Sequence, residues 1–158
     1  MLINVGDAAP AFDLPATGGR TAALEAGRWM VVYFYPKADT SGCTKQAQAF
    51  QGILPALEAI GASLIGISPD PLPAVERFAA KFDLTFPLAG DPEKTVLQAY
   101  GVWVEKSMYG RKYMGVERTT LLIAPDGTVA QVWPKVKIPG HAEAVLNAVR
   151  AKAAPKDA

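Results

Sequence analysis

The sequence is short of the residue types on which most covalent and metal chemistry depends. Its 158 residues include one cysteine, Cys43, and one histidine, His141. A single cysteine cannot form an intrachain disulfide or a CxxC redox pair, and zinc sites built from several cysteine and histidine ligands are excluded. His141 stands in a Pro-Gly-His-Ala turn that opens the last predicted helix, so we interpret it as a surface or capping residue rather than a partner of Cys43.

The sequence also lacks an excess of charge of one sign, and it lacks long apolar runs. The chain carries 16 Lys and Arg against 15 Asp and Glu, a balance that gives no support to bulk-charge binding of nucleic acid or a membrane surface. No apolar stretch approaches the ~20 residues of a spanning helix, and residues 1–10 lack the regions of a secretory signal. We therefore expect a cytoplasmic protein with no nucleic-acid partner and no membrane partner.

Familiar binding and catalytic motifs are absent too. There is no GxGxxG or GxxxxGK[ST] loop for a nucleotide, and no cluster of histidines and carboxylates suggests a metal. Ser68 lacks the second glycine of a nucleophile elbow. We therefore expect no cofactor and no metal, which leaves Cys43 as the main chemical candidate.

What the sequence does contain is enough apolar material, 50% of its residues, for a sizeable core in one domain. Four apolar segments predict strands, the last two joined by a Pro-Asp-Gly turn into an antiparallel hairpin. Three-and-four spacing predicts helices between and after them, with Pro55 expected to kink or divide the first. This order predicts a mixed α/β sheet covered by helices on both faces. The strands are residues 29–35, 63–68, 119–124 and 129–133, and the helices are residues 44–60, 73–82, 92–100 and 141–152.

Cys43 falls between the first strand and the first helix, at the end of a parallel sheet where α/β proteins place their sites. The free N–H groups and positive end of the helix favour a thiolate there. A thiol ionised near pH 6 instead of ~8.5 needs about 3.4 kcal/mol, and a helix terminus supplies at most ~2 kcal/mol. We therefore expect a nearby cation. Arg118 is the candidate, while Lys37 and Lys45 are expected in solvent. The alternative is an inert buried cysteine, which the polar turn at 39–42 disfavours.

Residues 33–43 resemble the peroxidatic motif of the peroxiredoxins. They contain Tyr-Phe-Tyr-Pro and then the spacing Pro36-x-x-x-Thr40-x-x-Cys43. The Ser-Gly-Cys-Thr sequence at 41–44 is similar to the bacterioferritin-comigratory, or PrxQ, class. The similarity continues along nearly the whole chain, in the segments 6–15, 66–70, 86–91 and 117–127.

This resemblance implies a thioredoxin-like fold, with one domain over residues 1–153 and a short tail, 154–158. It implies thiol-dependent reduction of hydrogen peroxide and organic hydroperoxides, with Cys43 as the peroxidatic nucleophile that becomes a sulfenic acid. Thr40 would hydrogen-bond the substrate oxygen and Pro36 would shield the pocket from water. Arg118 would stabilise the thiolate and the charge of the transition state.

The chain departs from the family pattern at the resolving cysteine. Many members carry one five residues after the first, where this chain has Gln48, or on the following helix at 78–81, which has none here. The chain is therefore similar to the one-cysteine form, in which an external thiol such as thioredoxin, glutaredoxin or glutathione completes the cycle. We expect a monomer or weak homodimer. The basic segment 105–115 has the charge to dock a reductant, although such a stretch is more commonly a solvated insertion.

Two other functions stay open at this point. One is a thioredoxin-fold redox sensor or binding protein, whose Cys43 forms mixed disulfides without turning over peroxide. The other is a peroxiredoxin that works mainly as an oligomeric holdase. Oxidation of Cys43 by peroxide no faster than that of free cysteine would favour the sensor, and a monomer in every redox state would contradict the holdase.

Overall fold

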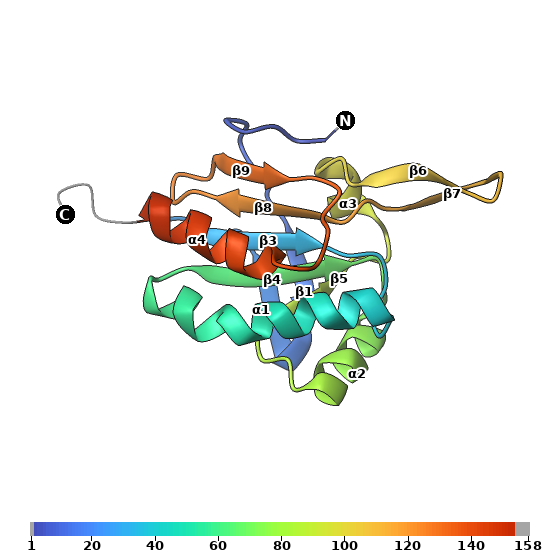
Figure 1. Cartoon of the computed structure of the whole chain (residues 1–158), viewed down its shortest axis with the longest axis horizontal. Coiled ribbons are helices and arrows are strands. Elements are labelled where there is room, and N and C mark those ends of the chain that lie inside the picture. The colour runs from blue at the N-terminus through green and yellow to red at the C-terminus, as the bar shows by residue number, and fades with distance from the viewer. Residues whose placement is uncertain (1, 154–158) are drawn as a thin grey trace.

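The computed structural model describes residues 2–153 (Figure 1), so the predicted tail, 154–158, lies outside the described residues. Its centre is a seven-stranded mixed sheet in the order β2-β1-β5-β4-β3-β8-β9. Strands β3, β4 and β5 run parallel, and the other pairings in this sheet are antiparallel. The bounds of these strands are β1 Asp13–Ala16, β2 Arg20–Ala23, β3 Met30–Phe34, β4 Ser63–Ser68, β5 Leu88–Gly90, β8 Thr119–Ile123 and β9 Val129–Trp133.

Helices cover both faces of the sheet. Helices α1, α2 and α4 bury their apolar sides in one core, while α3 and the N-terminal residues cover the other core. The predicted α/β class with helices on both faces is confirmed. No helix within residues 2–153 is long and apolar enough to cross a membrane. The bounds are η1, a 3₁₀ turn, Thr17–Gly19, α1 Ser41–Ala59, α2 Leu72–Phe82, α3 Thr95–Ala99 and α4 His141–Ala153.

Strand β3 lies in the middle of the sheet and is buried along its whole length. Val31 and Tyr33 point into the core beneath α1 and α4, whereas Met30, Val32 and Phe34 point into the opposite core. Because both faces are covered, apolar residues are favoured at every position instead of at alternate ones. This explains the unbroken apolar run from which the strand was predicted.

Gly66 on β4 leaves room for the ring of Tyr33. The two residues face each other across the β3–β4 pair. A Cβ on Gly66 would lie 2.8 Å from Cζ of Tyr33 and 2.8 Å from Cδ2 of Leu88. The ring therefore lies close against the backbone of the neighbouring strand. Its other side stacks on Phe50 of α1, with 4.6 Å between the ring centroids.

Helix α1 is continuous, although Pro55 lies inside it. Of the two expected effects of Pro55, division of the helix is therefore wrong, and a kink stays a prediction. Proline removes one helical N–H and so leaves the carbonyl of Gln51 without its usual donor. Pro55 is exposed, and on that side of the helix water can bond the freed carbonyl.

The segment before β8 forms a separate two-stranded sheet, a hairpin that projects from the rest of the molecule (Figure 1). It consists of β6, Trp103–Met108, and β7, Arg111–Val116. Tyr109 and Gly110 join the strands with φ angles of 52° and 77°, the positive values that a type I′ turn requires. The predicted solvation of 105–115 is confirmed, but its strand structure was not predicted.

The structure contradicts the interpretation of His141 as a surface or capping residue. Although it begins α4, its side chain is buried, with its ring edge-on to Phe50 and Trp133 at centroid distances of 5.9 Å. The ring nitrogen Nε2 shares a 2.8 Å hydrogen bond with Oγ1 of Thr120. Burial lowers the pKa of His141 to about 4, so the ring is neutral at neutral pH.

Candidate active site

Cys43 is the third residue of α1, just beyond the carboxyl end of β3. Thr40 precedes the helix in an extended conformation, and its carbonyl accepts the first helical hydrogen bond from the backbone N–H of Thr44 at 2.8 Å. Cys43 therefore belongs to the first turn, where backbone N–H groups lack helical acceptors and the helix dipole is positive. Its side chain is only 2% exposed.

Arg118 reaches the same sulfur from the neighbouring strand. It directly precedes β8, whose Thr119 pairs with Phe34 at the end of β3, so the two strand ends meet at one edge of the sheet. Nη2 of Arg118 donates to Sγ of Cys43 at 3.3 Å, and Nη1 donates to Oε1 of Gln46. The guanidinium thus brings a permanent positive charge into contact with the thiol.

Gln46 is a site residue that the sequence analysis missed. It follows Cys43 by three residues, which places both on the same face of α1, and it is only 1% exposed. A polar residue on the buried face of an amphipathic helix is the signal that points to it, because such a side chain needs a partner. Since its amide is neutral, Gln46 holds Arg118 without cancelling the charge of the guanidinium.

The carboxylate of Asp70 fixes the loop between β3 and α1. Oδ2 of Asp70 accepts a 2.7 Å hydrogen bond from the backbone N–H of Ala38 and a 2.8 Å hydrogen bond from Oγ of Ser68. Ser68 ends β4, the strand next to β3. These hydrogen bonds tie the loop to the end of β4, and neither Cys43 nor Arg118 takes part in them.

The other predicted site residues lie on this loop. Pro36 is half-buried and follows β3 by two residues, and Thr40 is exposed. Oγ1 of Thr40 donates to the carbonyl of Lys37 at 2.8 Å, which leaves the oxygen lone pairs as acceptors. Lys37 and Lys45 are exposed, as predicted.

Tyr33 and Tyr35 are buried in the same core cluster as Cys43, and their ring centroids lie 5.4 Å apart. Burial raises the pKa of both hydroxyls, and negative charge on Cys43 adds to the rise, so both are neutral donors at neutral pH. Within residues 2–153 neither the hydroxyl of Tyr33 nor Nε2 of Gln46 has a hydrogen-bond partner. An unpaired buried donor costs about 1–3 kcal/mol of stability.

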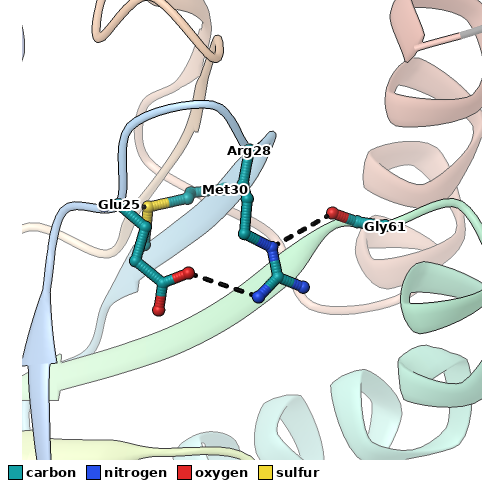
Figure 2. Close-up of polar contacts among 4 residues, drawn as sticks. All are labelled: Glu25, Arg28, Met30 and Gly61. Carbon is teal, nitrogen blue, oxygen red and sulfur yellow. Dashed lines mark hydrogen bonds and ion pairs between the residues drawn. The ribbon is translucent and has the colours of Figure 1, made fainter.

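A cavity of about 430 Å³ lies at the opposite end of the strands from Cys43, where β4 begins. It is lined in part by Arg20, Glu25 and Arg28. Arg28 donates to the carboxylate of Glu25 at 3.2 Å and to the carbonyl of Gly61 at 3.5 Å, and Figure 2 shows both contacts. Arg20 donates to backbone carbonyls. Both arginines of this cavity are thus hydrogen-bonded, and Cys43 is not among the lining residues.

The sequence matches a known family over most of its length. Residues 5–132 match the AhpC/TSA family. The chain belongs to the AhpC/TSA family. Peroxiredoxin Bcp of Xanthomonas campestris is 44% identical over 149 residues, which cover 92% of this chain and 93% of that protein. Peroxiredoxin Bcp of Escherichia coli K12 is 40% identical over 147 residues, covering 92% and 94%.

Solved structures of AhpC/TSA peroxiredoxins have the same fold. A cysteine-to-serine variant of Xylella fastidiosa PrxQ is 36% identical and matches with a TM-score of 0.90, covering 97% of this chain and 99% of that chain. The bacterioferritin comigratory protein of X. campestris, studied for its alkyl peroxide reduction activity, is 42% identical with a TM-score of 0.85, covering 90% and 92%. The peroxiredoxin described here has the predicted thioredoxin-like fold and is a thiol peroxidase of the PrxQ/Bcp class with one cysteine.

Proposed function

We propose that this peroxiredoxin reduces hydrogen peroxide and organic hydroperoxides at Cys43, and that an external thiol completes the cycle. The 3.3 Å contact between Nη2 of Arg118 and Sγ of Cys43 carries the proposal. A permanently charged guanidinium and the positive end of α1 together favour the thiolate, the nucleophilic form of cysteine. The alkyl peroxide reduction of the X. campestris relative supports the inclusion of organic hydroperoxides.

In the oxidative step, the thiolate of Cys43 attacks the terminal peroxide oxygen. An S–O bond forms while the O–O bond breaks, and the departing oxygen takes a proton to leave as an alcohol or water. Sulfur loses two electrons and becomes a sulfenic acid. Arg118 stabilises the charge that spreads onto the peroxide, Thr40 accepts a hydrogen bond from the substrate O–H, and Pro36 excludes water.

In the reductive step, an external thiol attacks the sulfenic sulfur, which releases water and forms a mixed disulfide. A second thiol then breaks this disulfide and restores Cys43. The chain has no second cysteine for this purpose. Because Cys43 is only 2% exposed, the first turn of α1 has to open before a protein thiol can reach it.

We further propose thioredoxin, glutaredoxin or glutathione as the reductant, and a monomer or weak homodimer as the working state. The cytoplasm is the expected compartment, because it keeps such thiols reduced. A coupled turnover assay that compares thioredoxin with glutathione and glutaredoxin identifies the reductant. Sedimentation of the reduced and oxidised protein tests the oligomeric state, and large assemblies in either form would favour the holdase.

Stopped-flow measurement of Cys43 oxidation by hydrogen peroxide and by an alkyl hydroperoxide tests the peroxidase directly. We expect oxidation much faster than that of free cysteine, because the thiolate and its cation are already in contact. The variant Cys43→Ser should consume no peroxide. A rate no faster than that of free cysteine would refute the proposed peroxidase and favour the redox sensor.

A further inference from the structure

The β6–β7 hairpin has two faces of different composition. Opposed residues of an antiparallel pair share a face, and neighbours along each strand alternate between faces. The register of the hairpin therefore defines two sets of exposed or half-exposed side chains. The basic face consists of Lys106, Met108, Arg111 and Tyr113, and the mixed face consists of Glu105, Ser107, Lys112 and Met114.

The two faces differ in how their charges are balanced. On the mixed face, Nζ of Lys112 lies 3.8 Å from a carboxylate oxygen of Glu105. Among the hairpin residues, the basic face carries two cations, Lys106 and Arg111, and no carboxylate. The charge of Glu117, just after β7, acts on Lys106, whereas the charge of Arg111 is available to an acidic partner.

The basic face also borders the active site. The stem of Lys106 lies across Gly115, where a Cβ would be 3.3 Å from Cδ and 3.7 Å from Cε of the lysine. Burial lowers the pKa of Lys106 and the charge of Arg118 lowers it further, while the charges of Glu117 and Cys43 act in the opposite direction. The ammonium of Lys106 is thus close enough to the site to sense the sulfur and its arginine. Strand β7 itself ends two residues before Arg118.

The hairpin gathers most of the exposed large apolar side chains of residues 2–153. With the exception of Val5, all of them lie between residues 108 and 114. Tyrosine, methionine and arginine are the residue types enriched at protein interfaces, and clustered exposed apolar side chains mark interaction sites. The exposed fractions are 55% for Met108, 99% for Tyr109, 43% for Tyr113 and 51% for Met114.

We propose that the basic face docks a dithiol protein reductant whose thiols are surrounded by an apolar patch with acidic residues. This inference rests on the proposed function, in which an external thiol reduces Cys43. The cations of the face complement an acidic partner, and Met108 and Tyr113 complement an apolar one. A flat, projecting ribbon offers area to a protein surface, whereas a small thiol is bound in a concave pocket.

Docking on the hairpin is compatible with the reductive chemistry. The hairpin is a sheet of its own, so a bound partner does not hold the first turn of α1 closed. One thiolate of the partner attacks the sulfenic sulfur and water leaves. The second thiol of the partner then attacks the mixed disulfide, so the partner becomes a disulfide and Cys43 regains its thiol.

Two pairs of adjacent residues, with one member of each pair on each face, provide a matched test. Arg111→Glu and Lys112→Glu make the same change of charge, and Tyr113→Ser and Met114→Ser remove apolar side chains of similar exposure. Turnover is measured with thioredoxin and glutaredoxin as protein probes and with dithiothreitol as a small dithiol. For the better protein probe, we expect Arg111→Glu to raise KM about tenfold and Tyr113→Ser about fivefold, with the mixed-face variants within about twofold of wild type. Turnover with dithiothreitol and stopped-flow oxidation by peroxide should not change.

Several outcomes would overturn the docking proposal while the peroxidase stands. Equal effects of Arg111→Glu and Lys112→Glu on KM would show that the overall charge of the hairpin, and not the basic face, attracts the reductant. Unchanged KM values in the basic-face variants would exclude the face as a docking surface. Turnover with dithiothreitol but with neither protein would exclude a dithiol protein, and self-association abolished by Arg111→Glu would assign the face to a second copy of the chain. Slow oxidation of the wild-type protein by peroxide would instead refute the proposed function.

Discussion

Two arginines at opposite ends of the strands of the central sheet have different partners. Arg28, beside the cavity at the start of β4, donates to the carboxylate of Glu25 and to a backbone carbonyl (Figure 2). Arg118, at the other end, donates to the neutral amide of Gln46 and to the sulfur of Cys43. The first arginine is neutralised by its neighbour, while the positive charge of the second has no carboxylate among these partners.

The difference shows that the presence of a cavity does not by itself locate the chemistry in this protein. A paired arginine next to a carboxylate holds local structure, and as an exposed pair it contributes about 0–1 kcal/mol. An arginine held by a neutral amide keeps its field for the group that it faces. The following experiments are designed to break or sharpen this comparison.

The largest effect is expected when the two arginines are removed in parallel. Arg118→Ala should slow oxidation of Cys43 about 10²- to 10³-fold, because a fixed cation beside the developing charge is lost. Arg28→Ala is the matched control and should leave the rate unchanged. Stopped-flow oxidation by peroxide measures both rates, and equal rates in the two variants would contradict the comparison.

Thr40→Val is expected to have the next largest effect. The hydroxyl is assigned to the substrate oxygen, so its loss should slow peroxide reduction about 10- to 10²-fold. Alkylation of the same thiol by iodoacetamide should slow less, because that reagent has no peroxide oxygen. If both reactions slow equally, Thr40 acts on the thiol or on the fold and not on the substrate.

Gln46→Leu tests whether the amide positions the guanidinium. The charge of Arg118 remains but loses one anchor, so oxidation should slow about fivefold, less than in Arg118→Ala. The control is Gln51→Leu, on the same helix, which removes hydrogen bonds to Thr85 far from the sulfur. Gln46→Glu keeps an oxygen acceptor but adds a negative charge beside Arg118, so its oxidation rate should stay below that of wild type, and a fully restored rate would show that a neutral partner is not required. Identical rates in the Gln46→Leu and Gln51→Leu variants would remove Gln46 from this role.

The smallest effect on activity is expected for His141→Gln, because His141 has no role at the sulfur. As a buried ionisable group, His141 instead affects the pH dependence of stability. Its folded-state pKa of about 4 lies below the ordinary value of 6.5, so the unfolded chain binds the proton more tightly. The resulting stability is fully present above pH 6.5 and is lost as the pH falls toward 4, at up to about 1.4 kcal/mol per pH unit. Urea unfolding at pH 7 and pH 5 should show a larger loss for wild type than for His141→Gln. The same loss in both proteins would exclude His141 as its source.

Much of the fold was predictable because buried positions are occupied by apolar residues, whose spacing along the sequence differs between strands and helices. Strands β3, β4, β8 and β9 and the four helices were predicted, with bounds that differ by up to three residues from the structure. The hairpin was not predicted because residues on both of its faces are exposed, so no alternation of apolar and polar residues develops. Strand β5 has only three residues, too few for any period to be recognised.

The site was predictable to the extent that its residues are close in sequence. The stretch from Pro36 to Cys43 carries its spacing in eight consecutive residues. Arg118 is 75 residues from Cys43 and was proposed only as the cation that a thiolate needs, a role that the family resemblance then supported. The prediction that His141 is a surface or capping residue was wrong, because the turn in which it stands contains no information about Thr120 and the sheet beneath. Contacts between distant segments are determined by packing, which local sequence does not record.

Gly66 sets a limit on which mutations this fold can accumulate. A side chain at this position would displace the ring of Tyr33, and that ring is stacked on Phe50 of the helix that carries Cys43. Even alanine would therefore disturb the packing beneath the helix that carries the nucleophile. A saturation library selected for peroxide resistance should retain only glycine at position 66, while the neighbourhood of Arg28 drifts freely.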